Sequence, residues 1–309
     1  MNHNSINWDN IRIFLAVARL QSAFEASNHL KIDQSTISRR LKKLEEEIGT
    51  ELFTRNSQGH LLNANGHRLL EYAEAMEGTI SSMESKLGGD SQILTGSIRL
   101  GATEGFGSTF LAPHLANFCE LHTGLTVDLL ALPRLINLSK READLVVSIE
   151  RPEKGPYITC KLTDYKLQAY ATRQYLEDHP PIENLEDLSK HKFTGYVDEY
   201  SFSPKLQYLK NLVPNAAVPF RSSSLTAQLY AALQGKTLAV LPCFLAKNHP
   251  SLIPVLPKKT GFNRAFWLIA PSERKNVARV SELWDYLRHI SSINQDYLLG
   301  DGLKIIKNE

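Results

Sequence analysis

Apolar residues at the start of the chain recur with the period of an α-helix, and polar caps separate the helices that they predict. Between residues 8 and 19 an apolar side chain returns every three or four positions, which predicts an amphipathic helix with one core face. Ser22 and Glu25 form a capping box, in which the hydroxyl and the carboxylate satisfy exposed amides of a second helix. This second helix is short and ends near Leu30.

A third helix and a strand pair follow directly. Asp33 is a natural N-cap for this helix, and Gly49 supplies its C-terminal stop. The chain then extends from Leu52, turns around Gln58 and Gly59, and returns, which is typical of a small β wing. The third helix has a narrow buried stripe, which consists of Ile37, Leu41, Leu44 and Ile48.

The exposed side of the third helix carries hydrogen-bonding and basic side chains. An α-helix fits the major groove of B-DNA, where the N-terminal residues of a recognition helix reach base edges. Gln can pair with adenine and Arg with guanine, whereas Lys neutralises phosphate without reading the sequence. The side chains left outside the buried stripe are Gln34, Ser35, Ser38, Arg39, Arg40, Lys42 and Lys43.

The same face also fits a simpler interpretation. Lys42 can pair with Glu46 and Lys43 with Glu47, which is the pattern of a solvated helix surface held by ion pairs. The order of capped short helix, tight turn, capped basic helix and wing favours a winged helix-turn-helix instead. Residues 1–66 hold eight Lys and Arg against seven Asp and Glu, so this segment is not basic overall. The prediction therefore depends on where the basic residues lie on the third helix.

A longer helix with a heptad pattern follows the wing. Its apolar residues alternate steps of four and three positions over nearly three heptads, which predicts an a/d seam and therefore a dimer. The alternative is that this stripe packs on the core of its own domain. Residues 88–91 then break the helix and supply a hinge. The seam consists of Leu69, Ala73, Met76, Ile80, Met83 and Leu87.

The remainder of the chain alternates strands with helices. Apolar segments around Ile98, at 127–130 and at 144–149, with a helix between the first two, predict a mostly parallel sheet covered by helices. A second lobe begins at about Lys166, and residues 266–270 return to the first lobe. Two lobes joined by two crossings resemble periplasmic binding proteins, which close around a ligand by hinge motion.

The N-terminal segments together resemble the LysR-type transcriptional regulators. The resemblance implies an α/β protein with three parts that cover nearly the whole chain: a winged helix-turn-helix domain, a linker helix and a two-lobed effector-binding domain. We expect these at residues 1–66, 67–90 and 91–309, with lobe I at about 91–165 and 266–309 and lobe II at about 166–265. The segments that carry the resemblance are FLAVA at 14–18, SAF at 22–24, QSTISRRLKKLE at 34–45 and GTELFTR at 49–55.

The resemblance also implies which residues contact DNA, with Arg55 near the wing and the minor groove. Two positions depart from the family pattern. Ser35 stands where the family often has proline, and Asn63-Ala64-Asn65-Gly66 replaces a commoner Thr-Glu-Ala-Gly or Thr-Pro-Ala-Gly. The fold prediction does not depend on them, but the operator sequence is not predicted. The candidate DNA contacts are Ser22, Gln34, Ser35, Thr36, Ser38, Arg39, Arg40, Lys42 and Arg55.

An effector is expected in the cleft between the lobes. Ligands of open α/β sheets bind beyond the carboxyl ends of strands, against helix N-termini. By resemblance to the family, Thr103, Ser148 and the stretch after Tyr196 line this cleft. The serine run 222–224 also fits plain helix capping by Ser224. The candidate effector contacts are Thr103, Glu104, Ser148, Arg151, Tyr196, Ser222 and Ser223.

The sequence leaves the charge of the effector open. Arg134, Arg151 and Arg221 fit an anionic effector, whereas Glu104 and Glu150 fit a cationic or amphipathic one equally well.

Composition narrows the class of protein. With 42% hydrophobic and 22% charged residues, the chain is typical of a soluble globular protein, and its net charge of +2 means that any DNA-binding surface is local. No secretory signal or membrane span is visible, and three distant cysteines (Cys119, Cys160 and Cys243) indicate a reduced cytoplasm. P-loop, HExxH and GxSxG motifs are absent, so we expect neither enzyme activity nor a cofactor or metal.

The sequence therefore predicts a cytoplasmic transcription regulator that acts as a dimer or a dimer of dimers. Its predicted partners are double-stranded DNA and a small-molecule effector of unknown identity. The alternative is a cytosolic two-lobed small-molecule-binding protein, or an enzyme, with a non-functional N-terminal module.

Overall fold

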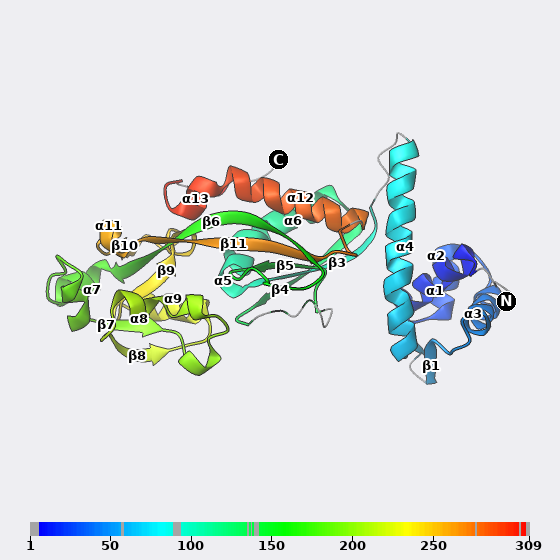
Figure 1. Cartoon of the computed structure of the whole chain (residues 1–309), viewed down its shortest axis with the longest axis horizontal. Helices are drawn as coiled ribbons and strands as arrows, with labels where there is room; N and C mark the ends of the chain where they lie inside the picture. The colour runs from blue at the N-terminus through cyan, green and yellow to red at the C-terminus, as the bar shows by residue number, and fades with distance from the viewer. Residues whose placement is uncertain are drawn as a thin grey trace. The chain divides into compact units, whose positions relative to one another are not determined.

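The computed structural model divides the chain into two compact units (Figure 1). The N-terminal unit comprises residues 1–92 with 276–278, and the C-terminal unit comprises 93–275 with 279–309. The predicted hinge lies outside the described residues beyond Gly88. The residues that the structure describes are 6–56, 59–88, 94–134, 136, 138, 142–275, 277–302 and 304–306.

Three helices form the core of the N-terminal unit, as predicted. Phe14, Ile37 and Leu44 are completely buried where these helices meet, because each helix turns its apolar stripe inward. Ile48, the last residue of the predicted stripe, packs against this core but is only half-buried. The helices are α1 (Trp8–Leu20), α2 (Ala23–Leu30) and α3 (Gln34–Ile48).

The caps of these helices follow the sequence in part. The Ser22 hydroxyl accepts a hydrogen bond from the Glu25 amide at 3.2 Å, so the first half of the predicted capping box is confirmed. Asp33 occupies the N-cap position of α3, but its side chain makes no capping hydrogen bond. Lys31 ends α2 in the left-handed backbone conformation, which turns the chain tightly toward α3.

The wing is a two-stranded antiparallel sheet of β1 (Phe53–Asn56) and β2 (Gly59–Leu62). The Leu52 amide donates to the Glu45 carboxylate at 2.8 Å, which fixes the start of the wing against α3. Of the predicted turn residues, Gln58 lies outside the described residues.

The long helix α4 (Ala64–Gly88) begins at the segment that departs from the family pattern. Asn63 caps it, because its side-chain oxygen accepts from the Gly66 amide at 2.9 Å while its amide group donates to the Glu51 carbonyl at 2.8 Å. Gly66 has no room for a side chain, since a Cβ would lie 2.1 Å from the Leu52 carbonyl oxygen. Asparagine therefore caps this helix in place of the family's threonine.

The structure divides the predicted seam of α4 between two roles. Leu69 and Ala73 pack into the core of their own unit, so at these two of the six seam positions the alternative of packing on the unit's own core holds. Met76 is 43% exposed, because the core of the N-terminal unit does not extend that far along the helix. The Arg19 guanidinium ties α1 to this stretch through the Glu77 carboxylate, at 2.6 and 3.1 Å. The side chains of Met83 and Leu87 lie outside the described part of the chain.

The C-terminal unit is built on one seven-stranded sheet in the order β10-β6-β11-β5-β3-β4, with β9 paired to β6. The expectation of a mostly parallel sheet is wrong. Only β3 pairs in parallel, with β4 and β5, whereas β6 and β11 pair antiparallel with each other and with their remaining neighbours. The strands are β3 (Gly96–Thr103), β4 (Leu125–Leu132), β5 (Leu145–Ser148), β6 (Tyr157–Thr172), β9 (Ala239–Pro242), β10 (Leu252–Pro254) and β11 (Phe262–Pro271).

The two long strands β6 and β11 are the crossings between two lobes. They run side by side through the unit (Figure 1), from Tyr157 opposite Pro271 to Leu167 opposite Phe262. Lobe I holds β3, β4 and β5 with α5 (Glu104–Phe106), the π-helical turn η1 (Gly107–Leu111), α6 (Ala112–Leu121), α12 (Ala278–Ile293) and α13 (Gln295–Leu299).

Lobe II contains a second, two-stranded parallel sheet of β7 (Lys192–Gly195) and β8 (Ala217–Arg221). The strand β9 joins this lobe to the main sheet, because Phe193 of β7 bridges to Leu238 just before β9. The remaining elements are α7 (Arg173–Asp178), η3 (Glu186–Lys190), η4 (Asp198–Tyr200), η5 (Pro204–Leu206), α8 (Tyr208–Leu212), α9 (Leu225–Leu233), α10 (Cys243–Ala246) and α11 (Pro257–Thr260).

Candidate functional site

One face of α3 is free of packing contacts and carries polar side chains. Ile37, Leu41 and Leu44 turn into the core, so the residues on the opposite side of the helix are left in solvent. Thr36 is half-buried at the edge of this face, and Ser22 is half-buried at the start of α2. The predicted DNA contacts that are exposed together on α3 are Gln34, Ser35, Ser38, Arg39 and Lys42.

Ion pairs draw some basic residues of α3 toward other partners. Arg40 lies 3.6 Å from the carboxylate of Asp9 on α1, which turns it away from the exposed face. Lys42 lies 3.9 Å from Glu46, and both side chains are largely in water. The pairs of the simpler interpretation therefore exist, but exposed pairs of this kind contribute little and leave a lysine available to phosphate.

The wing follows α3 in the chain, and the structure describes its backbone pairing. The Arg55 backbone pairs with His60 across the two strands, and its side chain lies outside the described residues. The His60 amide donates to the Gln21 carbonyl at 3.1 Å, which ties the wing to the end of α1.

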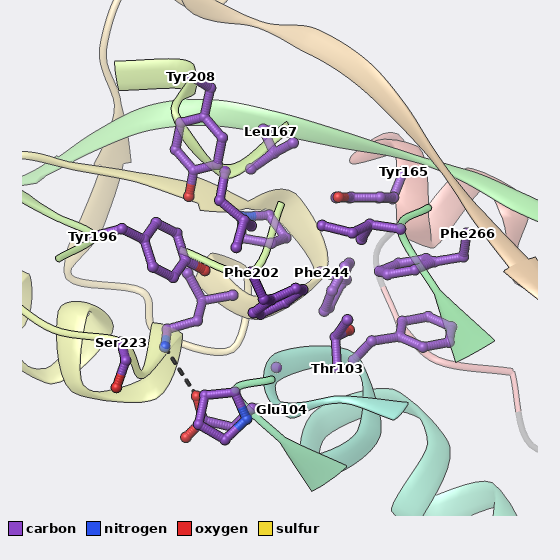
Figure 2. Close-up of a pocket in the computed structure, with 17 residues that line it drawn as sticks. Thr103, Glu104, Tyr165, Leu167, Tyr196, Phe202, Tyr208, Ser223, Phe244 and Phe266 are labelled. Carbon is purple, nitrogen blue, oxygen red and sulfur yellow. Dashed lines mark hydrogen bonds between the residues drawn. The ribbon is translucent and has the colours of Figure 1, made fainter. Parts of the chain in front are cut away.

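Within the C-terminal unit, a cavity lies between the lobes (Figure 2). It encloses about 480 Å³ between its lining atoms, its open mouth included. Four of the predicted effector contacts line it: Thr103, Glu104, Tyr196 and Ser223. Phe106, from the segment expected to border the ligand, also lines it. Five further aromatic side chains that were not predicted from the sequence line it as well: Tyr165, Phe202, Tyr208, Phe244 and Phe266.

Glu104 spans the cavity and binds the opposite lobe. One carboxylate oxygen accepts a hydrogen bond from the Ser224 hydroxyl at 2.8 Å, and the other accepts from the Leu225 amide at 2.9 Å. Ser224 also caps α9, since its hydroxyl accepts from the Ala227 amide at 3.0 Å. A carboxylate at the first turn of a helix is stabilised by exposed amides and by the helix dipole. The capping role proposed for Ser224 is confirmed, and the same residue also joins the lobes.

A second carboxylate joins the lobes on another side. Glu150 of lobe I accepts hydrogen bonds from the Ser203 hydroxyl and, at 2.9 Å, from the Lys205 ammonium. Burial acts to raise the pKa of Glu150, but these two hydrogen bonds and the charges of Lys205 and Arg264 outweigh it and hold the pKa below its ordinary value. Glu150 therefore stays ionised and committed to lobe II.

Three predicted effector contacts do not line the cavity. The Ser148 side chain is buried and its hydroxyl accepts from the Glu150 amide at 3.0 Å, while its neighbour Ile149 faces the cavity instead. The Arg151 guanidinium lies over the Trp267 ring, 5.2 Å from its centroid. The Ser222 hydroxyl accepts from the Ser224 amide at 3.1 Å, so it serves the turn before α9.

Several hydroxyl groups of the cavity have no hydrogen-bond partner in the described part of the chain. Within the described part of the chain, the hydroxyls of Thr103, Tyr165 and Ser223 make no hydrogen bond. Burial and the nearby charge of Glu104 raise the pKa of Tyr196, although a hydrogen bond with Tyr208 acts the other way. The phenols of the cavity are therefore neutral hydrogen-bonding groups.

Metal-ligand clusters and membrane-spanning helices are both missing from the described residues. Among them, no group of three or more His, Cys, Asp or Glu side chains could hold a metal ion. No helix in the described ranges is long and apolar enough to cross a membrane.

Comparison with known protein families assigns both units. Residues 8–67 match the family described as "Bacterial regulatory helix-turn-helix protein, lysR family". Residues 91–291 match the family described as "LysR substrate binding domain". The second match alone covers more than half of the chain.

Individual relatives agree over nearly the full length. The chain is 26% identical over 292 residues to the HTH-type transcriptional regulator PtxR of Pseudomonas aeruginosa, which covers 92% of this chain and 93% of that protein. The structure of CrgA, a LysR-type transcriptional regulator from Neisseria meningitidis, aligns with a TM-score of 0.58 at 22% identity, over 92% of this chain and 98% of CrgA. An OxyR mutant from Corynebacterium glutamicum aligns with a TM-score of 0.62 at 18% identity, over 93% and 96% of the two chains.

Proposed function

The chain belongs to the LysR family of transcriptional regulators, and on that premise we propose that the exposed face of α3 binds operator DNA. The chain acts as a regulator and not as an enzyme, and the alternative of a non-functional N-terminal module is not favoured. Gln34, Ser35, Ser38 and Arg39 have hydrogen-bonding groups suited to base edges or phosphate, and Lys42 has a charge suited to phosphate. The observation that carries the proposal is their joint exposure on one side of a helix whose other side is buried.

DNA binding, assembly and effector binding are assigned to successive parts of the chain. We assign DNA binding to residues 1–66, dimerisation to the linker at 67–90 and effector binding to 91–309. The matched family ranges support this division. One winged unit makes few contacts, whereas a two-fold dimer reads two half-sites one or more helical turns apart. Because its partner is DNA, the regulator is proposed to work in the cytoplasm.

The effector acts through the cavity between the lobes. A ligand shifts the equilibrium between two conformations of a protein only by the difference between its affinities for them. Glu104 and Glu150 hold the lobes together at two places, so a ligand that favours or opposes these contacts changes the closure of the C-terminal unit. A change in subunit geometry then alters half-site spacing and the bend of the operator.

The test is a salt titration of the full-length chain on its own upstream DNA and on a random duplex. We expect tighter binding to the upstream DNA, with a footprint that spans two half-sites. Arg39→Ala is expected to cost about 1–3 kcal/mol of specific binding if the arginine pairs with a base edge, and Lys42→Ala to lower the salt slope by about one. The matched control is Arg12→Ala, which removes an exposed arginine of α1 near Asp9.

Equal binding of the two DNAs would overturn the proposal. So would an Arg12→Ala variant that loses as much affinity as Arg39→Ala, because the effect would then follow net charge and not the exposed face of α3.

A further inference from the structure

We propose that the cavity between the lobes takes a small, uncharged aromatic ligand that carries one hydrogen-bonding group. This inference rests on the proposed function, because it names the chemical class of the effector. Four properties of the cavity walls carry it: their charge, the position of the nearby arginines, the state of Glu104, and the rings with their uncommitted hydroxyls.

Among the residues that the structure describes, the walls of the cavity hold no positive charge to meet an anion. Of the 17 residues drawn in Figure 2, Glu104 is the only one with a formal charge, and that charge is negative. An anionic ligand would lose its hydration in a space lined mainly by apolar side chains and would be repelled by the Glu104 carboxylate. The cavity therefore disfavours an acid.

The three arginines that the sequence offered to an anion are placed elsewhere. The Arg134 guanidinium lies 2.9 Å from the Glu142 carboxylate. Arg151 lies over the ring of Trp267, and Arg221 is exposed at the end of β8, away from the lining of the cavity. None of the three supplies a counter-charge to a ligand in this site.

Glu104 is also poorly suited to pair with a cationic ligand. Both of its oxygens already accept hydrogen bonds, from the Ser224 hydroxyl and the Leu225 amide, at the positive end of α9. An ammonium group would compete with these donors and would lose its own hydration on entry. An uncharged ligand leaves this contact between the lobes intact.

The rings of the cavity pack on one another and form an aromatic wall. Tyr165 stacks on Phe266 at 4.2 Å between centroids, and Phe106 stacks on the other side of Phe266 at 4.1 Å. Phe244 meets Phe106 edge-on at 5.7 Å, so stacked and edge-on contacts both occur within this wall. Aromatic pairs prefer such offset-stacked and edge-to-face arrangements, which favours a ligand that is itself aromatic.

Three hydroxyls at the walls are free to recognise one polar group of the ligand. In the described ranges, the hydroxyls of Thr103, Tyr165 and Ser223 make no hydrogen bond. A hydroxyl both donates and accepts, so these groups suit a hydroxyl, carbonyl or amide on the ligand equally well. Tyr165 is 6% exposed, and a ligand that reaches its hydroxyl takes the place of solvent there and gains a hydrogen bond.

The test compares three probes that share one ring and differ in charge: benzyl alcohol, benzoate and benzylammonium. Each is titrated calorimetrically into the full-length protein. We expect benzyl alcohol to bind at roughly millimolar affinity, as suits a single-ring fragment, and at least about tenfold tighter than either charged probe. Tyr165→Phe removes one hydroxyl and keeps the ring, so we expect it to weaken benzyl alcohol by about three- to tenfold. Ser223→Ala is a second, milder variant at the opposite wall.

Tyr230→Phe is the matched control, because Tyr230 is 58% exposed and does not line the cavity. The Tyr230→Phe variant is expected to bind benzyl alcohol with the same affinity as the unmodified chain. Tighter or equal binding of benzoate or benzylammonium would overturn the proposal, and so would the absence of binding by all three probes. The DNA footprint is measured on the same preparation, so an intact footprint with failed probe binding rejects only the ligand class and leaves the proposed DNA function standing.

Discussion

The Glu104 carboxylate and the Ser224 hydroxyl meet at 2.8 Å across the cavity, although 120 positions separate them in the chain. Ser224 donates this hydrogen bond while accepting another from the Ala227 amide at 3.0 Å, so one hydroxyl both caps α9 and binds lobe I. The adjacent Leu225 amide donates to the second oxygen of Glu104. The start of α9 is therefore completed by a residue of the opposite lobe.

This arrangement predicts that Glu104 and Ser224 are energetically coupled. Glu104→Gln and Ser224→Ala are each expected to destabilise the C-terminal unit by about 1–2 kcal/mol, since a charge-assisted hydrogen bond or a cap is lost. The double variant is expected to cost less than the sum by at least about 0.5 kcal/mol, because the shared bond can be lost only once. Urea unfolding and amide exchange at Leu225 and Ala227 measure both effects.

The control for this cycle is Ser223→Ala, whose hydroxyl has no hydrogen-bond partner within the described residues. It is expected to leave amide exchange in the first turn of α9 unchanged. Strictly additive costs for Glu104→Gln and Ser224→Ala would contradict a direct coupling between them.

The residues around this contact show how far the site was predictable. A strand end and a helix start are visible in the sequence, so the rule that ligands lie against helix N-termini found Glu104 and the serine run. The rule could not tell that Ser148 turns toward the Glu150 amide, because that depends on the local turn. Tyr165 and Phe266 were missed because they come from distant strands, and only their pairing in the sheet brings their rings together.

The fold shows the same division between local and distant information. The helices and the wing of the N-terminal unit follow from periodicity and caps that each span a few residues. The antiparallel pairing of β6 with β11 joins segments about one hundred residues apart, and short buried strands carry no signal for the direction of their partner. The apolar stripe of α4 is present as predicted, but periodicity does not identify what covers it, and Leu69 and Ala73 pack on the core of their own unit.

The division of that seam makes a prediction about assembly. Met76→Glu is expected to weaken self-association by at least about tenfold, because a charge at a seam position must be desolvated in the dimer. Ala73→Glu is expected to unfold the N-terminal unit instead, since Ala73 is completely buried in its own core. Sedimentation of the full-length chain at micromolar concentration measures the first effect, and circular dichroism the second.

The matched control is His67→Glu, which adds the same charge at an exposed position of α4 off the seam. It should sediment as the unmodified chain does. If Met76→Glu also sediments unchanged, the exposed part of the seam does not take part in dimerisation.

His114 gives the C-terminal unit a stability that depends on pH. Its ring is 1% exposed in α6, packs 4.8 Å from the Phe110 ring, and has no hydrogen-bond partner for either nitrogen among the described residues. Burial lowers the pKa of His114 below its ordinary value of 6.5. In the unfolded chain the same imidazole takes up a proton near pH 6.5, so the unfolded state binds more protons in the window below that pH.

The sign follows from this difference. The stability is fully present above about pH 6.5 and is lost as the pH falls toward the folded pKa, by at most about 1.4 kcal/mol per pH unit for one group. His114→Leu is expected to flatten this slope and to raise stability at pH 6, because the leucine has no polar atom to leave unpaired. The slope does not vanish, since burial also lowers the pKa of His191. Thermal unfolding between pH 5 and pH 8, roughly the range over which histidines titrate, measures it, with His289→Leu on the exposed side of α12 as control. A variant with an unaltered slope would mean that folding does not shift the pKa of His114.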